Sequence, residues 1–300
     1  MSNGSESRPQ GEEYLSPSRA AAGGMAEALD SHAAWLRKDP EGTRAKLTHA
    51  QLRRADFRGA DLSGITLDKA YLCHSRLSET ILRGANFRRA RLAYATLAGA
   101  DFSHANFARA QMYGCDASEA RGEYAKLRAA RLAGANLQRI ELEEADCTDA
   151  NLEGADLERA FLSGAKFRAA ILDRANLAHA VCAGTDFREA HMTNVNLSGA
   201  DLADSNIFHH AWLRGAVLTH DTIIDTGETW GEYLAETLPQ LIAACGGLEV
   251  LVELSHRDWD DAGHPIPVLG RTDPPRMLMP RVFQFRALHH SGLIPTMRSE

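Results

Sequence analysis

The sequence predicts an all-β solenoid, because one short period runs through most of the chain. Counting from Leu47 in steps of five, almost every position as far as Ile207 is Leu or Phe, and a small residue stands two places before it. A fixed period over such a length indicates a repeat architecture. Neither a helical period of about 3.6 nor a strand period of about 2 puts every fifth residue on one surface. Each unit must therefore turn a corner, and four corners close a square coil.

The repeating unit reads Ala, then Asp or Asn, then Leu or Phe, followed by two mostly polar or small residues. Clear examples are Ala55-Asp56-Phe57, Ala85-Asn86-Phe87, Ala100-Asp101-Phe102, Ala135-Asn136-Leu137, Ala155-Asp156-Leu157 and Ala200-Asp201-Leu202. These units resemble the pentapeptide repeat family over roughly residues 45 to 225, about three fifths of the chain. The resemblance implies a right-handed quadrilateral β-helix whose central residue and small residue point inward. About nine coils stacked about 4.8 Å apart would give a rod roughly 40 Å long.

The flanks of the repeats predict four further segments. Residues 1–24 are rich in Ser, Gly, Glu, Arg and Pro and are expected to form a disordered tail. Met25, Leu29, Ala33 and Leu36 recur at helical spacing, so residues 25–44 are expected to form an N-terminal capping helix before the repeat region 45–226. We expect a C-terminal helical cap at 227–254 and an irregular, proline-rich C-terminal extension at 255–300.

The predicted C-terminal cap carries an apolar stripe. Thr229 and Glu232 form a capping box at its start. The stripe runs to Cys245 and includes the predicted interface residues Trp230, Tyr233, Leu234, Leu238 and Leu241. In the pentapeptide repeat family, C-terminal apolar elements form twofold interfaces, so the resemblance implies a possible homodimer through this region.

Composition indicates a reduced, cytoplasmic protein. Hydrophobic residues make up 44% of the chain, but no apolar run approaches the roughly 20 residues of a membrane helix, so no membrane association is expected. The N-terminus lacks the apolar stretch of a secretory signal. There are five cysteines, an odd number, and three of them fall on inward positions, which favours small apolar core residues over disulfides.

One side of the predicted coil is basic. If four units make one coil, residues twenty apart stack, and side one has the centres Leu47, Leu67, Phe87, Phe107, Leu127, Cys147, Phe167, Phe187 and Ile207. Its outward positions hold ten Lys or Arg against five Asp or Glu. The predicted partner-binding residues of this basic face are Arg88, Arg109, Arg128, Arg168 and Arg188.

The adjacent side four is acidic. Its centres run from Leu62 to Leu202, and its outward positions hold eight Asp or Glu against Arg83 and Arg121. The predicted partner-binding residues of this acidic face are Glu141, Glu143, Glu144, Asp201 and Asp204. Charge is also graded along the chain: residues 51 to 100 hold nine basic and four acidic residues, and residues 141 to 210 hold five and thirteen.

The resemblance raises a second functional hypothesis. Acidic rods of the family imitate duplex DNA, bind DNA gyrase and protect it from fluoroquinolones. Duplex DNA carries one negative charge per about 1.7 Å, so a rod of roughly 40 Å would need some twenty for a close match. Residues 45 to 226 hold 22 basic and 23 acidic residues and are nearly neutral. Mimicry would therefore depend on the acidic C-terminal half.

Two irregularities interrupt the repeat. Ala117 and Gly122 are too small for central positions, which predicts a bulged coil or a tyrosine folded inward. A six-residue step leads from Ile207 to Leu213, after which Leu218 and Ile223 are expected to resume the count. The step contains His209 and His210, but two histidines without a third ligand are weak evidence for zinc, and no metal or other cofactor is predicted.

The sequence therefore predicts a non-enzymatic interaction scaffold with charge-polarised faces. Outward residues on stacked coils form flat ladders, whereas catalysis needs a concave pocket with perturbed acids and bases. We expect a protein partner, DNA gyrase being one possibility, and no direct contact with nucleic acid.

Overall fold

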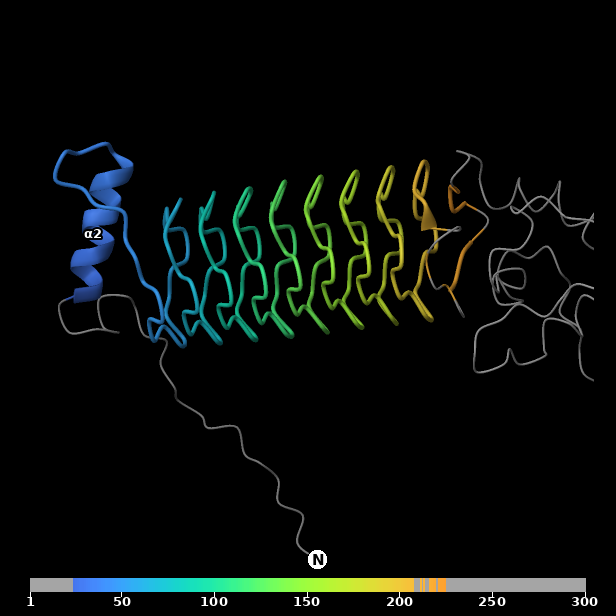
Figure 1. Ribbon diagram of the computed structural model, residues 1–300, viewed down its shortest axis with the longest axis horizontal. Helices are drawn as coiled ribbons and strands as arrows, with labels where there is room; N and C mark the ends of the chain where they lie inside the picture. Colours follow the sequence, from blue (N-terminus) through green and yellow to red (C-terminus); the bar gives the residue numbers. More distant parts are fainter. Residues whose placement is uncertain (1–23, 208–210, 212, 214–215, 220, 225–300) are drawn as a thin grey trace, which may run out of the picture.

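The computed structural model describes residues 24–207, 211, 213, 216–219 and 221–224. It consists of the helix α2 (Gly24–Leu36) and a stack of regular coils that runs away from this helix (Figure 1). Residues 1–23 of the predicted tail, the predicted cap at 227–254 and the predicted extension at 255–300 lie outside the described residues.

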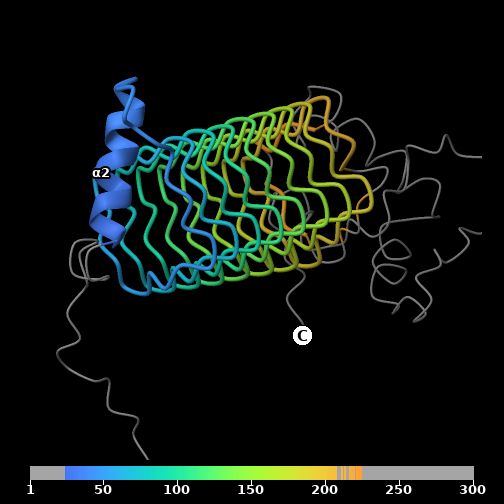
Figure 2. The ribbon, with the colours of Figure 1, turned by 60° about the vertical axis from the view of Figure 1, so that its left-hand side comes forward.

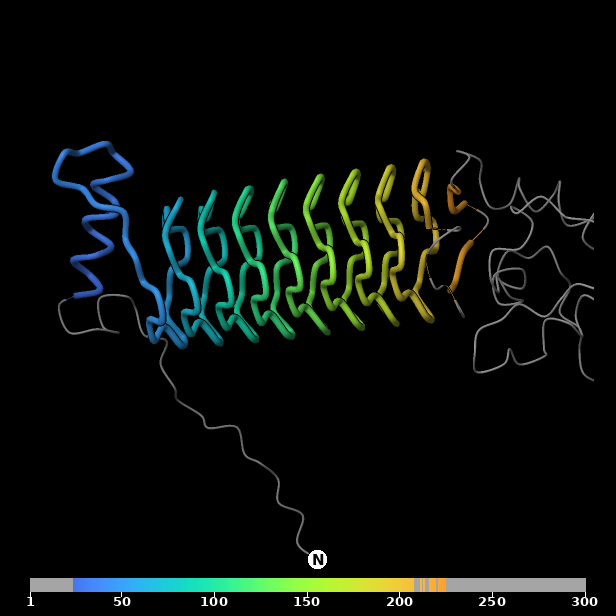
Figure 3. The backbone as a smooth tube through the Cα atoms, in the orientation of Figure 1, coloured from blue at the N-terminus to red at the C-terminus, as the bar shows by residue number. Residues whose placement is uncertain are grey.

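The coils are held together by parallel bridges between residues twenty positions apart. These bridges run without a break in register from Lys46↔Thr66 to Val181↔Asp201. Each bridge involves the residue just before a central position, so four units make one coil as predicted. Figures 2 and 3 show the coils stacked with the same outline from one end of the regular region to the other. The result is a four-sided parallel β-helix.

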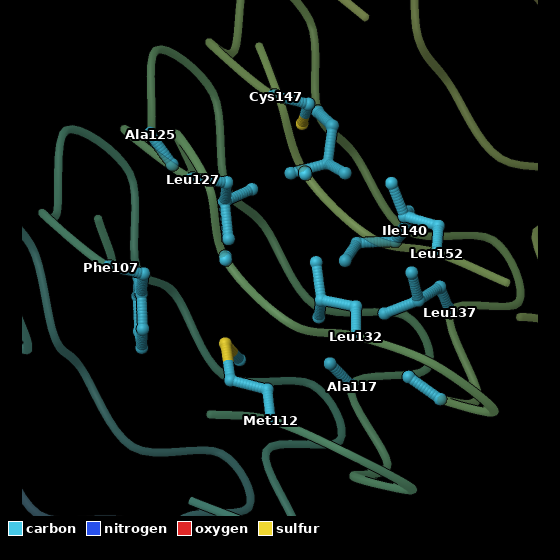
Figure 4. Close-up of a cluster of buried hydrophobic side chains, with 14 of the residues drawn as sticks. Phe107, Met112, Ala117, Ala125, Leu127, Leu132, Leu137, Ile140, Cys147 and Leu152 are labelled. Atoms are coloured by element: carbon cyan, nitrogen blue, oxygen red, sulfur yellow. The ribbon is translucent and has the colours of Figure 1, made fainter. Parts of the chain in front are cut away.

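The core is filled by two inward residues per unit. Central residues such as Leu52 and small residues such as Ala55 are fully buried, and this pattern continues to Leu202. Figure 4 shows that buried side chains twenty apart lie in columns, for example Phe107 beside Leu127 and Cys147. Phe87 and Phe107 stack with ring centroids 4.6 Å apart. Large and small side chains thus alternate in the buried interior.

The corners are tight turns with a positive φ angle. The Ala55 amide donates to the Leu52 carbonyl at 3.1 Å, and the intervening Arg54 has a φ of 60°. A positive φ at the third residue is the feature that type II turns require. Glycine suits this position, yet many corners carry other residues, including Ala129 and Ala169 with φ of 54° and 53°. The backbone is strained at the corners that carry a residue other than glycine, because a positive φ brings Cβ close to the following carbonyl oxygen.

The preference for Asp or Asn before the central residue has a local cause. The Asp61 carboxylate accepts the Ser63 amide at 3.0 Å, and Asn106 accepts the Ala108 amide at 3.0 Å. These side chains form Asx turns that fix the chain as it enters the corner. Asn also pairs along the axis, as where Asn176 donates to Asp156 at 3.0 Å. The consensus therefore encodes both the corner and the stacking.

The helix α2 packs against the core at the first coils. Ala28 and Leu29 contact the core, and Met25 and His32 are buried. The Nδ1 atom of His32 accepts the Ala45 amide at 3.3 Å, which connects the helix to the first coil. Burial is the main cause that lowers the pKa of His32, although the negative charge of Asp61 acts in the opposite direction.

The predicted bulge at Ala117 and Gly122 is wrong. Bridges 96↔116↔136 and 101↔121↔141 keep the twenty-residue spacing through both positions. Tyr124 remains half exposed and does not fold inward. The space left by Gly122 is filled from above and below, because an added Cβ would lie 2.1 Å from Cε2 of Phe102 and 2.8 Å from Cδ2 of Leu142.

The second irregularity does shift the register, and in two steps. Asn196 pairs with Val217 and Asp201 pairs with Ile223, so the offset rises from twenty to 21 and then 22 residues. Leu218 is buried as predicted, but Ile223 occupies an outward bridge position, and Ile224 is the buried residue. The prediction that Ile223 is central is therefore wrong. One further residue is accommodated between Leu218 and Ile224, where the Thr222 amide donates to the Thr219 carbonyl at 3.0 Å.

Candidate interaction surfaces

The bridges assign every outward residue to one of four sides. Side one follows the centres Leu47 to Ile207, side two Leu52 to Met192, side three Phe57 to Leu197 and side four Leu62 to Leu202. Outward residues twenty apart form straight columns along the axis, about 4.8 Å from one coil to the next. Charges on these columns are held in fixed positions relative to one another.

The five predicted basic-face arginines are exposed on side one, but they differ in their partners. Three of them form ion pairs through Nη2. The distances are 3.6 Å from Arg128 to Oδ2 of Asp149, 2.8 Å from Arg168 to Oε1 of Glu189, and 2.6 Å from Arg188 to Oδ2 of Asp186. The guanidinium groups of Arg88 and Arg109 make no ion pair with any described residue. Exposed ion pairs contribute little stability, yet they reduce the charge offered to a partner. Arg88 and Arg109 therefore present the strongest free charge of the five.

The predicted acidic residues are divided between two parts of side four. Glu141, Glu143 and Glu144 lie in one coil, where Glu141 pairs with Arg121 at 3.2 Å. Asp201 and Asp204 lie three coils farther along, and Asp201 accepts the Ala203 amide at 3.0 Å. The structure thus groups the three glutamates closely and separates them from the two aspartates.

Glu143 has the most unfavourable environment of these acids. Its Oε2 atom is buried without a hydrogen-bond partner among the described residues. Burial is the main cause that raises the pKa of Glu143, and repulsion from Glu141 and Glu123 adds to it. The coil therefore holds a concentrated negative charge despite an electrostatic cost.

The sequence did not predict side two as a binding surface. When outward residues twenty positions apart are grouped by side, however, side two is also basic in the first coils and adjoins side one. We define the amino-terminal basic surface as the outward residues of sides one and two in the coils from Lys46 to Arg131. It holds eleven Lys or Arg, namely Lys46, Arg53, Arg54, Lys69, Arg88, Arg89, Arg91, Arg109, Lys126, Arg128 and Arg131. Its one acidic residue is Asp68. The same two sides hold four basic and six acidic residues between Asp146 and Asn194.

A hollow of about 430 Å³ separates α2 from the first coil. Its apolar lining includes Leu29, Ala33 and Phe57, and Asp56 and Arg58 stand at its margin. These two charged side chains bind each other at 2.7 Å. The hydrogen bond to Arg58 is the main cause that lowers the pKa of Asp56. Their charges are mutually neutralised, but Arg37 and Asp61 also line the hollow.

Three of the four described cysteines are buried in the core, and Cys73 is partly exposed. The buried thiol of Cys115 has its pKa raised to about 12 by burial, and burial raises the pKa of Cys147 and Cys182 as well. Such thiols are unreactive. Within the part of the chain that the structure describes, no three His, Cys, Asp or Glu residues are grouped to hold a metal ion. His209, His210 and the predicted interface residues Trp230, Tyr233, Leu234, Leu238 and Leu241 lie outside this part.

Within the same residues, no helix has the length and apolar character needed to cross a membrane.

A five-residue unit, a four-sided parallel coil and charged outward columns together define a class of solenoid proteins. The family model for pentapeptide repeats matches the chain in eight copies, within residues 43–121 and 125–219. The protein belongs to the pentapeptide repeat family, whose fold is the right-handed quadrilateral β-helix. A search of curated proteins found no match.

Several solved structures are similar to the chain. HetL, a pentapeptide repeat protein involved in heterocyst differentiation regulation from the cyanobacterium Nostoc sp. strain PCC 7120, is 28% identical over 65% of this chain and 97% of its own, with a TM-score of 0.32. Full-length QnrB1, a plasmid-mediated fluoroquinolone resistance protein, is 18% identical over 62% of this chain and 91% of its own, with a TM-score of 0.33. A pentapeptide repeat protein from the Arabidopsis thaliana thylakoid lumen is 23% identical over 46% of this chain and 89% of its own, with a TM-score of 0.26.

Proposed function

We propose that the protein is a non-enzymatic, cytoplasmic scaffold that binds a protein partner through charge-polarised sides. In this proposal the rod has about nine coils and helical caps at both ends, and it acts by rigid display. Surfaces that are ordered before binding lose little conformational entropy on association. The stripe at Trp230, Tyr233, Leu234, Leu238 and Leu241 is proposed to join two copies, which sedimentation of the full chain would test.

One observation carries the scaffold proposal. Charges of opposite sign without an ion pair among the described residues occupy separate sides of one rod, with Arg88 and Arg109 on side one and Glu143 and Glu144 on side four. Electrostatic complementarity of this kind directs association and rejects wrongly charged partners. The paired arginines Arg128 and Arg168 are expected to contribute less than the two unpaired ones.

Charge reversal tests the scaffold proposal. Affinity capture from cell extract, read by mass spectrometry, should lose the same partner with Arg88→Glu/Arg109→Glu or with Glu144→Lys/Asp204→Lys. These residues are exposed, so the melting temperature should stay unchanged. The control is Arg139→Glu/Arg159→Glu on side three, which should retain the partner. Equal capture of the partner by the parent protein and by all three double variants would contradict a role for sides one and four.

A second candidate function is DNA mimicry towards DNA gyrase. The observation that favours it is the dense acidic coil, in which burial, together with Glu141 and Glu123, raises the pKa of Glu143. Inhibition of gyrase supercoiling, or its rescue from a fluoroquinolone, should then depend on Glu141, Glu143 and Glu144 and be indifferent to Arg88 and Arg109. Equal sensitivity to both sets would favour the scaffold instead.

A further inference from the structure

The amino-terminal basic surface has a charge density that the rest of the rod lacks. It lies on the blue-to-green coils of Figure 1, next to α2. Lys69 has a carboxylate nearby, with its Nζ atom 3.9 Å from Oδ2 of Asp68, and so has Arg128, with its Nη2 atom 3.6 Å from Oδ2 of Asp149. Six of the others are exposed and have no side-chain partner among the described residues: Lys46, Arg53, Arg88, Arg89, Arg109 and Lys126. These free cations repel one another unless an anion binds.

The cations form a ridge at the corner between sides one and two. Lys69, Arg89 and Arg109 occupy the positive-φ corner position in three successive coils, with φ of 55°, 57° and 60°. Because the coils keep the twenty-residue register, the three side chains start from one straight column. A ridge of this kind suits an extended, regularly charged chain that runs along the rod.

Tyrosines lie beside this ridge on side two. The guanidinium of Arg91 lies over the Tyr71 ring, 4.9 Å from its centroid. Tyr94 stacks on His74 with ring centroids 5.3 Å apart and remains 61% exposed. The Tyr113 hydroxyl accepts a hydrogen bond from Arg131 at 2.9 Å. Contacts between successive coils therefore hold three aromatic rings in fixed positions next to the cations.

The electrostatic field on this side acts on His74. Burial is the main cause that lowers the pKa of His74, and the positive charges of Arg54 and Arg53 lower it further. Arg53 and Arg54 thus add a positive potential at His74 to the larger effect of burial.

We propose that the amino-terminal basic surface binds single-stranded nucleic acid, with phosphates along Lys69, Arg89 and Arg109 and bases against the tyrosines of side two. This inference goes beyond the scaffold proposal, because it gives side two a ligand of its own. It also departs from the expectation that the protein makes no direct contact with nucleic acid.

The combination of charge and rings favours this ligand over other polyanions. Single-strand binding surfaces pair a basic track with exposed aromatic side chains, because every base has a face on which a ring can stack. Arginine planes such as that of Arg91 offer the same kind of stacking. An acidic protein segment would use the cations and leave the rings without a role. A duplex hides its base faces and would also contact only the cations.

Fluorescence anisotropy with the full chain tests the proposal. The probe is a fluorescein-labelled 15-nucleotide oligo(dT), compared with a 15-base-pair duplex and a poly-glutamate peptide. Tyr94→Ala should weaken oligo(dT) binding roughly fivefold or more, whereas Tyr94→Phe should retain it. Arg89→Ala/Arg109→Ala should weaken binding and reduce the slope of log K against log salt by about 0.7 for each phosphate that the variant no longer neutralises.

Matched controls separate this test from the scaffold proposal. Arg139→Ala/Arg159→Ala removes the same charge from side three and should leave oligo(dT) binding unchanged. In NMR titrations the pKa of His74 should rise when oligo(dT) binds, because phosphates offset Arg53 and Arg54. The proposal is overturned by no binding of oligo(dT), by binding of the duplex or of poly-glutamate as tight as that of oligo(dT), or by an unchanged affinity in Tyr94→Ala. Each of these results leaves partner capture through Arg88, Arg109 and side four as a separate question.

Discussion

Two departures from the five-residue repeat, at Gly122 and beyond Ile207, have opposite effects on the coil. At Gly122 a side chain is too small, and the bridges still join residues twenty apart. Beyond Ile207 residues are inserted, and the offset grows to 21 and then 22 residues. A deficit in volume is corrected by neighbouring side chains, whereas an excess in length must be taken up by the backbone at a corner.

The neighbours available to each site explain this difference. Each central residue lies between two others in its column, so Phe102 and Leu142 can fill the space beside Gly122. Neighbouring side chains cannot compensate for an inserted residue in this way. One extra residue inside the stack would move every later side chain off its inward position. The insertions occur after the last coil that pairs at an offset of twenty, where fewer later residues depend on the register.

The largest expected effect is that of restoring the consensus leucine at the first departure. Gly122→Leu should destabilise the protein by about 3 kcal/mol, because the new side chain competes with Phe102 for one space in a close-packed core. Urea unfolding monitored by circular dichroism would measure the loss. The double variant Phe102→Ala/Gly122→Leu should recover most of it, since the summed volume of the two residues is then nearly conserved. A Gly122→Leu protein as stable as the parent would mean that the site is a void.

The next effect concerns the hydroxyl group that organises the second departure. Thr222 Oγ1 donates to the Leu197 carbonyl at 3.0 Å and accepts the amides of Gly199 at 3.1 Å and Thr219 at 3.0 Å. Thr222→Val keeps the shape but leaves the Thr219 amide without this acceptor. It should destabilise the protein by about 2 kcal/mol, measured by the same urea unfolding.

Thr80→Val is the matched control for Thr222→Val. Thr80 is equally buried, and its hydroxyl donates only to the Phe57 carbonyl at 3.0 Å. That carbonyl also accepts the Ala60 amide, so the variant should cost about 1 kcal/mol or less. Equal losses at the two positions would show that the Thr222 hydroxyl has no special role in closing the altered corner.

The same contrast explains what the sequence could predict. The period from Leu47 to Ile207 predicted the buried columns correctly, because the inward positions are a local property of each unit. It failed at Gly122, since the filling residues are twenty positions away and their rotamers depend on packing. It failed at Ile223 because Ile223 and Ile224 are equally apolar, and only the bridge from Asp201 decides which one faces outward.

The basic and acidic surfaces show a related limit. Sorting by twenty placed Arg88 and Arg109 correctly on side one, but the sequence could not show that Arg128 is paired and these two are not. Ion pairs between coils depend on side-chain conformation as well as on column. Side two needed only the same sorting, and its tyrosines are visible in the sequence at Tyr71, Tyr94 and Tyr113.

A smaller effect is expected at the corners, which take up any excess in length. Ala129 has a φ of 54°, where glycine is less strained than alanine. Ala129→Gly should stabilise the protein by about 0.5 kcal/mol, because relief of strain exceeds the added entropy of the unfolded chain. Ala133→Gly, outside the set of positive-φ residues, should destabilise it. Thermal unfolding of both variants compares them, and a shift in the same direction for both would contradict strain at the corner.

An effect of similar size is expected on the surface of side four, one coil beyond Gly122. Glu143 has a raised pKa, so its charged form is disfavoured in the folded protein relative to the unfolded chain. Above the folded pKa this carboxylate therefore destabilises the native state. Glu143→Gln removes the charge and should stabilise the protein at neutral pH by about 0.5 kcal/mol.

The pH dependence of the Glu143→Gln effect identifies its cause. As pH falls through the raised folded pKa, Glu143 of the parent becomes protonated, and the gain from Gln should shrink. Below the ordinary glutamate pKa both states are protonated, and the gain should vanish. Glu119→Gln on side three, which removes a carboxylate paired with Arg139 at 3.2 Å, should give no such gain at neutral pH. A gain that persisted at low pH would mean that packing, and not the charge shared with Glu141 and Glu123, limits stability here.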